Sequence, residues 1–212
     1  MRIIAAILYL LTLSACTSHA QAQEQAQAQQ VTEHLQAQVP ESWIKGVDKN
    51  LPNLQVTEYF PADSKEVWER KLSYEALRGE PLPDPIDFAA SIAEQQADVC
   101  DQYSDKTIFS GYENGYPTMV QLYECGQNKR TLKPLVTVVK AIKGNTALYV
   151  ITRIWRLQPT APGQTTADLM PQAELAGWMQ SLKDIRLCDE SLLAHKCNTT
   201  TSDEPPSSQG GA

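Results

Sequence analysis

The chain has 212 residues, of which 42% are apolar, and this is enough to build the hydrophobic core of one domain of ordinary size. The formal net charge of -7 at pH 7 argues against broad nucleic-acid binding and against attraction to anionic lipid, because both favour a basic surface. We therefore expect no nucleic-acid partner.

The first sixteen residues have the layout of an export signal. Arg2 is a short basic region, and the apolar run at residues 3–13 is too short to span a bilayer comfortably. The run ends in Leu13-Ser14-Ala15-Cys16, which resembles the lipobox of bacterial lipoproteins. That resemblance implies cleavage before Cys16, acylation of this cysteine, and the lipid bilayer as a partner through its acyl chains. Because residue 17 is Thr and not Asp, the resemblance also implies a cell-envelope protein of the outer membrane whose domain faces the periplasm.

A segment rich in Gln and Ala follows the lipobox. We interpret residues 16–40 as the lipidated cysteine and a flexible tether, because apolar residues are too sparse for a continuous helical stripe. A coiled coil is the alternative, but sustained heptads are lacking. Cleavage after Ala20 would instead release the protein without lipid. We expect a single globular domain at residues 41–197 and a disordered tail at residues 198–212, which are rich in Thr, Ser, Pro and Gly.

The first part of the expected domain contains two strands. A turn at residues 42–44 would pack its tryptophan on the core. Residues 54–60 and 67–77 alternate between apolar and polar side chains, which is typical of strands, although residues 67–77 also fit a helix. The sequence Pro-Ala-Asp-Ser between them predicts a turn.

Two helices are predicted. The first begins at Asp84 and Pro85, because Asp is a good N-cap and Pro suits the first helical position. Its inner face would consist of Ala89, Ile92, Ala93, Gln96 and Cys100. The second opens at Pro171, and its apolar stripe would consist of Leu175, Trp178, Met179, Leu182 and Ile185.

Between these helices the sequence predicts four strands. Residues 107–112 and 118–125 form a pair joined by Glu113-Asn114-Gly115. Residues 134–157 form a long hairpin around Gly144-Asn145, a dipeptide suited to the positive φ angles of a two-residue turn. Both faces of this hairpin are apolar, so we expect it in the interior of a sheet.

The order β-β-α-β-β-β-β-α predicts an α+β fold in which an antiparallel sheet carries both helices on one face. This order resembles that of the MOG1/PsbP-like α/β/α sandwiches. The resemblance rests on element order alone, without a shared motif, and it implies nothing about function.

Four cysteines remain once Cys16 is assigned to lipidation. An even number in an exported chain favours disulfides, for which three pairings are possible. We choose Cys100–Cys125, which would join the first helix to a strand, and Cys188–Cys197, which would fold a short loop onto the second helix. The alternative is a metal site, which an oxidising compartment and the absence of a C-x-x-C spacing disfavour; its ligands would be Cys188, Asp189, His195 and Cys197.

Catalytic signatures are lacking. His19 and His34 precede the expected domain, and His195 has no accompanying G-x-S-x-G sequence, so it is interpreted as a loop residue. The sequence contains neither a Gly-rich phosphate loop nor a dinucleotide fingerprint. We assign no catalytic residue, no metal ligand and no cofactor. Paired carboxylates exist only in the general sense that any acidic chain has them, as at Glu66/Glu69 and Glu113/Glu124.

Two groups of residues are candidates for surface recognition. Tyr112, Asn114 and Tyr116 belong to an aromatic turn that would present two tyrosines to a partner, unless the tyrosines pack locally. Arg153 and Arg156 flank Trp155 at the end of a strand, unless they belong to the buried face of the sheet. The sequence thus predicts an envelope lipoprotein that binds an envelope or periplasmic protein as an accessory, inhibitor or immunity-type module. The alternative is a small-ligand or cell-wall-binding lipoprotein, or a hydrolase with an unrecognised cleft.

Overall fold

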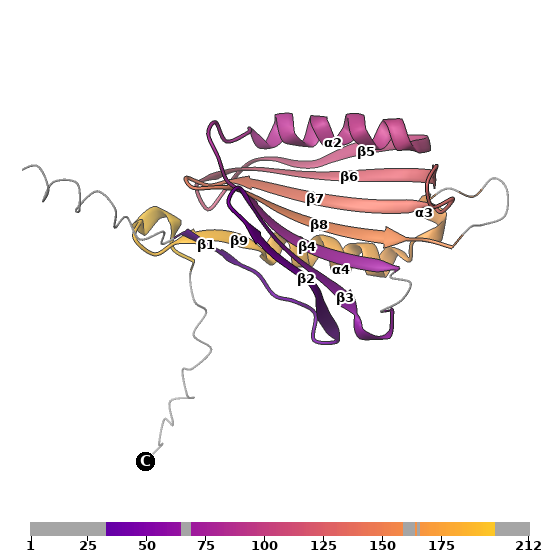
Figure 1. Ribbon diagram of the computed structural model, residues 1–212, viewed down its shortest axis with the longest axis horizontal. Coiled ribbons are helices and arrows are strands. Elements are labelled where there is room, and N and C mark those ends of the chain that lie inside the picture. Colours follow the sequence, from indigo (N-terminus) through magenta and orange to yellow (C-terminus); the bar gives the residue numbers. More distant parts are fainter. Residues whose placement is uncertain (1–32, 65–68, 159–163, 165, 198–212) are drawn as a thin grey trace, which may run out of the picture. The chain divides into compact units, whose positions relative to one another are not determined.

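The computed structural model of the protein describes residues 33–64, 69–158, 164 and 166–197 (Figure 1). These residues belong to one compact unit, Thr32–Ala212. Cys16 with the export signal, most of the tether, Glu66 and the tail at residues 198–212 lie outside the described residues. What the sequence predicts for them stays a prediction.

The centre of the fold is a seven-stranded antiparallel sheet with the strand order β2-β3-β4-β8-β7-β6-β5. β7 and β8 pair with each other and lie between β6 and β4, so the predicted interior position of the long hairpin is confirmed. The strands are β2 (Trp43–Leu51), β3 (Leu54–Pro61), β4 (Arg70–Leu77), β5 (Cys100–Glu113), β6 (Tyr116–Asn128), β7 (Leu135–Lys143) and β8 (Leu148–Arg156).

The tight turn that the sequence predicts at Gly144-Asn145 occurs in the other hairpin. Asn114 and Gly115 have φ angles of 48° and 83°, and they form a two-residue turn between β5 and β6. The β7–β8 hairpin closes through the four residues 144–147. Among the described residues, the five positions with positive φ do not include Gly144 or Asn145. A side-chain contact described below shapes that loop instead.

The two long helices cover opposite faces of the sheet. Helix α2 (Pro85–Val99) packs on the face that includes Val139, and helix α4 (Gln172–Asp184) packs on the face that includes Val138. We call these the α2 face and the α4 face. The α+β class and the antiparallel sheet are confirmed, but the prediction of both helices on one face is wrong. Neighbouring residues of β7 point to opposite faces of the sheet, and both faces are apolar. Each face must therefore be shielded from water by another element, here a helix.

Both predicted helix starts are confirmed. The carboxylate of Asp84 accepts a 3.0 Å hydrogen bond from the backbone N–H of Ile86, and Pro85 is the first residue of α2. Helix α4 begins directly after Pro171. In the part of the chain that the structure describes, no helix is both long enough and apolar enough to cross a membrane.

A second, two-stranded sheet was not predicted. β1 (Glu33–Gln36) pairs antiparallel with β9 (Arg186–Asp189). Residues 33–36 therefore belong to a strand and not to the tether predicted at residues 16–40, and β2 replaces the turn predicted at residues 42–44. Three short elements complete the described chain: η2 (Ala62–Ser64), α3 (Thr166–Leu169) and η3 (Leu193–His195).

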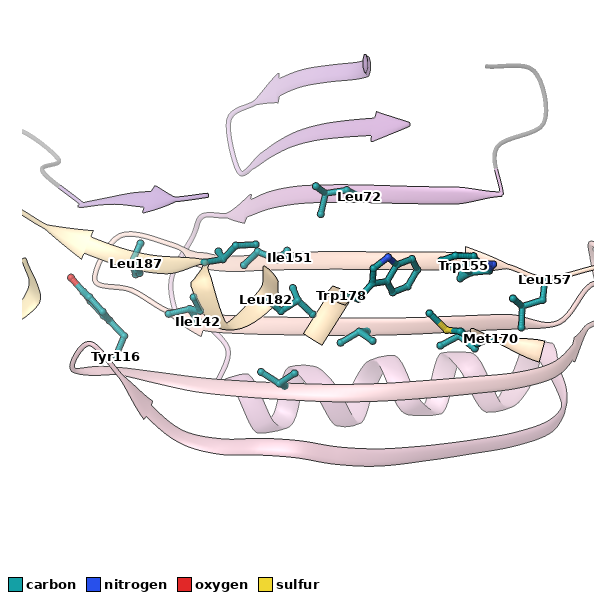
Figure 2. Close-up of a cluster of buried hydrophobic side chains, with 14 residues drawn as sticks. Leu72, Tyr116, Ile142, Ile151, Trp155, Leu157, Met170, Trp178, Leu182 and Leu187 are labelled. Carbon is teal, nitrogen blue, oxygen red and sulfur yellow. The ribbon is translucent and has the colours of Figure 1, made fainter. Parts of the chain in front are cut away.

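The larger hydrophobic core lies between α4 and the sheet, and Figure 2 shows the buried side chains of this cluster. Trp178 from α4 lies against Trp155 from β8, with ring centroids 5.0 Å apart. Leu72 and Ile151 are fully buried in the same cluster. The smaller core lies under α2. Burial of apolar area on both faces is thus the main stabilising contribution to this arrangement.

The cysteines form the two disulfides chosen from the sequence. Cys100–Cys125 joins the end of α2 to β6, and Cys188–Cys197 joins β9 to the segment after η3, with Cα–Cα distances of 5.4 and 5.3 Å. Because Cys188 and Cys197 are bonded to each other, the alternative metal site has lost two of its four expected ligands. Within residues 33–64, 69–158 and 166–197 no group of three or more metal-binding side chains comes together.

Candidate functional site

Three hairpin turns meet at one end of the sheet, which we call the turn end. The strand register places the β2–β3 turn, the β7–β8 loop and the β5–β6 turn there side by side. The strands β1 and β9 and the short helix η3 lie against the same end, on the left in Figure 1.

Asn114 braces the β5–β6 turn. Its side-chain N–H2 donates 2.8 Å hydrogen bonds to the carbonyl oxygens of Leu187 in β9 and His195 in η3. Asn tolerates the positive φ that the turn requires, and its amide supplies two donors. The candidate residue Asn114 is therefore a structural tie between the turn and the C-terminal segment.

Tyr116 is enclosed under His195. The two rings lie edge to face with centroids 4.4 Å apart, and only 2% of Tyr116 is exposed. Burial, followed by the nearby carboxylates of Glu33 and Asp189, raises the pKa of Tyr116 well above its usual range. The prediction that the turn presents two tyrosines to a partner is wrong for Tyr116. The hydroxyl of Tyr116 and Nδ1 of His195 are both shut off from solvent.

Apolar side chains remain exposed around this enclosed cluster. Tyr112, at the end of β5, is 74% exposed, and Leu193, in the η3 that Asn114 holds, is 87% exposed. Leu192 precedes Leu193 and is also exposed. We call Tyr112, Leu192 and Leu193 the apolar rim. Two further exposed residues, Leu51 at the end of β2 and Ile86 at the start of α2, belong to the turn end as well.

The β7–β8 loop holds the carboxylate of Glu33 from β1. The backbone N–H groups of Asn145 and Thr146 donate to it over 2.8 and 3.2 Å, and the Thr146 hydroxyl donates over 2.7 Å. The hydroxyl of Tyr149 adds a 3.3 Å hydrogen bond. A Cβ atom at Gly144 would lie 2.5 Å from the Glu33 carboxylate, so only glycine permits this approach. The sequence offers no signal for this contact, because Glu33 lies in the low-complexity segment.

Lys140 is a fully buried cation on the α4 face. Its ammonium group donates 2.8 Å hydrogen bonds to the carbonyl oxygens of Leu182 and Ile185, and it forms an ion pair with Glu113. Burial lowers the pKa of Lys140, and the Glu113 carboxylate opposes this shift. The signal in the sequence was a lysine inside a strand that otherwise reads as apolar on both faces. A buried lysine is retained only with such partners.

Arg153 and Arg156 do not form one patch. Arg153 lies opposite Val138 and Leu72 and points to the α4 face, whereas Arg156 lies opposite Leu135 and points to the α2 face. Only 5% of Arg153 is exposed, and burial lowers its pKa. The prediction of a shared arginine surface is wrong because an odd spacing along a strand places the two side chains on opposite faces.

One open groove lies where the chain between β1 and β2 passes the C-terminal end of α4. Its volume is about 400 Å³. One wall comes from residues just after or within β1, and the other from the end of α4 and the start of β9. The lining residues are Gln36, Ala37, Gln38, Ser181, Asp184, Ile185 and Arg186.

The chain is an α+β protein with a helix on each face of an antiparallel sheet. No protein-family model matches its sequence, and no curated protein matches it significantly. Among solved structures, it is similar to the Saccharomyces cerevisiae Ran-binding protein Mog1p, with 14% identity, 74% of this chain and 92% of that chain covered, and a TM-score of 0.49. A mutant of Mog1 gives the same values.

The protein LpqN, involved in cell envelope biogenesis of Mycobacterium tuberculosis, is also similar. Its identity is 11%, with 71% of this chain and 79% of that chain covered and a TM-score of 0.33. Similarities of this size concern the fold and carry no information about function.

Proposed function

We propose that the protein is a membrane-anchored envelope lipoprotein whose domain binds another envelope or periplasmic protein without catalysing a reaction. The accessory, inhibitor and immunity-type roles all fit this description. The observation that carries the proposal is the apolar rim: Tyr112, Leu192 and Leu193 are all exposed, and they belong to two segments that Asn114 joins at the turn end. Exposed apolar side chains on a rigid support are typical of protein interfaces.

The support under the rim favours recognition of a protein. The two hydrogen bonds of Asn114 hold the β5–β6 turn to η3, so the segments carrying Tyr112 and Leu193 are fixed to each other. The disulfide Cys188–Cys197 closes the same C-terminal segment. A preorganised aromatic and aliphatic surface loses little conformational entropy on binding, which favours affinity.

Lipidation of Cys16 would keep this surface close to the membrane. Sixteen residues separate Cys16 from Glu33, and a chain of that length reaches at most about 60 Å. Glu33 is bound at the turn end by the β7–β8 loop. The apolar rim would therefore stay within reach of partners in or near the same membrane.

Site-specific photocrosslinking in intact cells tests the proposal. The full-length protein would carry a photoreactive amino acid at position 112 or 193, and at position 132 as a control. Leu132 is also an exposed apolar residue, but it lies in the β6–β7 loop, away from the turn end. We expect one protein to be crosslinked from positions 112 and 193 and not from position 132.

Binding of the purified pair then tests the surface directly. Tyr112→Ser and Leu193→Ser should each weaken it by roughly tenfold or more, as expected for residues at the centre of an interface. Leu132→Ser should leave it unchanged. Equal crosslinking from all three positions, or unaltered affinity of both rim variants, would contradict the proposed surface.

A further inference from the structure

β5 is the last strand at one edge of the seven-stranded sheet (Figure 1). In the part of the chain that the structure describes, it pairs with β6 along one side and with no strand along the other. A strand in this position turns a row of backbone N–H and C=O groups outward. Such a row is able to pair with a strand of another chain.

The β5–β6 turn identifies the backbone groups that face outward. Its loop has two residues, so Glu113 and Tyr116, which flank it, form a hydrogen-bonded pair. Hydrogen-bonded and non-hydrogen-bonded pairs alternate along an antiparallel ladder. Tyr112 is therefore in a non-hydrogen-bonded pair with Pro117, which has no N–H, and Ser110 is in the next such pair. The N–H and C=O groups of Ser110 and Tyr112 thus point away from β6.

Solvent reaches this part of the edge. Ser110 is exposed, and Tyr112 is 74% exposed. Helix α2 joins β5 at the opposite end of the strand, at Cys100. The bulge of β5 lies between Thr107 and Phe109, so the pairing is regular from Phe109 to the turn. The outward groups of Ser110 and Tyr112 therefore belong to a regular and accessible stretch of strand.

The two edges of the sheet differ in charge. β2 carries Lys45, Asp48 and Lys49 and has a bulge after Lys45. By the same alternation, its two-residue turn directs the backbone groups of Asp48 and Asn50 outward. A second copy paired antiparallel there would place Lys49 of the two copies opposite each other, and like charges repel. Residues 107–112 of β5 carry no charge. The β2 edge is thus protected against self-pairing, and the β5 edge is not.

We propose that two copies of this chain pair through β5 about a two-fold axis at Gly111. Antiparallel pairing in this register places Ser110 of each copy opposite Tyr112 of the other, and both residues have outward backbone groups. Each of these pairs exchanges both N–H···O=C bonds, and the sheets of the two copies become one continuous sheet. This pairing goes beyond the proposed function and does not depend on it.

The side chains near the axis suit this register. Gly111 has no side chain, which lets the two strands approach closely. The ring of Phe109 lies over Gly111, 3.2 Å from the position of an added Cβ, so the two Phe109 rings would meet at the axis. On the α2 face, the large Tyr112 would lie beside the small Ser110 of the other copy. Glu113 would lie opposite Phe109, so no like charges face each other.

A cysteine at the axis tests the register. Gly111 of the two copies would form a non-hydrogen-bonded pair, whose Cα–Cα separation of about 4.5 Å permits a disulfide. Purified full-length Gly111→Cys, oxidised with diamide in detergent, should run as a disulfide-linked dimer on a non-reducing gel. Ser104→Cys places a cysteine on the same exposed strand but far from the axis, and it should give at least about tenfold less dimer. Equal linking of the two variants, or none in either, would overturn the proposal.

Removal of one outward N–H tests the hydrogen bonds. Proline is tolerated at a sheet edge where its missing N–H faces solvent, so Ser110→Pro should keep the circular dichroism spectrum of the unaltered protein. Sedimentation equilibrium over a concentration series should give the mass of two copies for the unaltered protein. Ser110→Pro should raise the dissociation constant of the dimer by at least about tenfold, whereas Ser110→Ala, which keeps the N–H, should leave it unchanged. A single-copy mass for the unaltered protein throughout the series, or equal dissociation constants for the two variants, would overturn the proposal.

Discussion

The ammonium group of Lys140 donates a hydrogen bond to the carbonyl oxygen of Ile185, 2.8 Å away, just beyond the last residue of α4. A second bond to Leu182 and the ion pair with Glu113 use its remaining donors. Carbonyl groups at a helix C-terminus lack partners within the helix and carry partial negative charge. A residue in the centre of the sheet thus fixes the end of the helix that covers it.

Lys140→Met should destabilise the protein by about 3 kcal/mol, because it leaves two buried carbonyl groups and a carboxylate without their partner. Denaturant unfolding measures this as a lower midpoint. Lys106→Met, on an exposed position of β5, should change the free energy of unfolding by less than about 0.5 kcal/mol. Adding Glu113→Leu to Lys140→Met should recover part of the loss. Equal midpoints for the two single variants would show that the buried contacts are not stabilising.

Glu33→Ala should detach β1 from the β7–β8 loop. The variant loses a carboxylate that accepts from two backbone N–H groups and two hydroxyls, which should cost about 1–3 kcal/mol. Faster hydrogen exchange at Asn145 and Thr146 is the local measurement. Glu41→Ala, at an exposed position outside this contact, should leave both amides protected. Unchanged exchange in Glu33→Ala would mean that the loop holds its shape without the carboxylate.

Replacement of glycine by alanine should change the free energy of unfolding in opposite directions at two positions. At Gly115, φ is +83° and an added Cβ would lie 2.6 Å from Nε2 of His195, so Gly115→Ala should destabilise by more than about 1 kcal/mol. Gly177 lies inside α4 with no atom within 4 Å of the added Cβ, so Gly177→Ala should stabilise by about 0.5–1 kcal/mol. Thermal unfolding compares the two variants. In a protein that also carries His195→Ala, the imidazole ring is gone. Gly115→Ala should then cost only the free energy of holding a non-glycine residue at a positive φ angle.

Stability should decrease as the pH rises above 10. Burial raises the pKa of Tyr74 and Tyr103 to about 12 and also raises the pKa of three further tyrosines, Tyr116, Tyr123 and Tyr149. The folded state therefore holds these protons more tightly than the unfolded state, in which tyrosine titrates near pH 10. Their contribution to stability is full below pH 10 and is lost as the pH rises through the pKa values of the folded state, which for Tyr74 and Tyr103 lie at about 12.

Tyrosinate absorbance and circular dichroism, recorded together, measure this alkaline transition. The two signals should change together, since the buried hydroxyls ionise on unfolding. The lowered pKa values of Lys140 and Arg153 act in the opposite direction, because the unfavourable burial of each charge is relieved when its proton is lost, but these are two groups against five tyrosines. Ionisation of all tyrosines near pH 10 in a folded protein would contradict the prediction.

Cys16→Ser tests the lipid anchor. The variant cannot form the thioether, so the protein should move from the membrane fraction to the supernatant of lysed cells. Metabolic labelling with a palmitate analogue should mark the unaltered protein and not the variant. Membrane association that persists in Cys16→Ser would contradict anchoring through this cysteine.

Much of the sheet could be predicted because its signals are local. The long hairpin is apolar on both faces over two arms that are adjacent in the sequence, and this pattern determines an interior position. Asp84 and Pro85 mark the start of α2 by a local signal. The carboxylate of Asp84 accepts a hydrogen bond from the backbone N–H of Ile86, only two residues later. The cysteine pairing was one of three possibilities, and the chosen pairs close the shortest loops.

The candidate site was less predictable, because its contacts join residues far apart in the sequence. Asn114 and Tyr116 were predicted as binding residues, but the partners that make them structural, His195 and Leu187, come some 70–80 positions later. Glu33 lies more than 110 positions before the loop that binds it. The periodicity of apolar residues along the chain gives no information about contacts between residues so far apart in the sequence.

The sequence by itself determined the class of fold, the central hairpin and the helix starts, and it favoured the cysteine pairs that the structure contains. Each of these follows from side-chain alternation, capping or loop length, which act between residues close in sequence. The tertiary structure alone decided which face each helix covers, which tyrosine stays exposed, and how the buried cations differ. Lys140 and Arg153 both interrupt apolar strands, but the end of α4 and Glu113 give Lys140 its acceptors, whereas Nε of Arg153 has none among the described residues. The reason is physical: the cost of a buried charge depends on the groups that surround it in space, not on its neighbours along the chain.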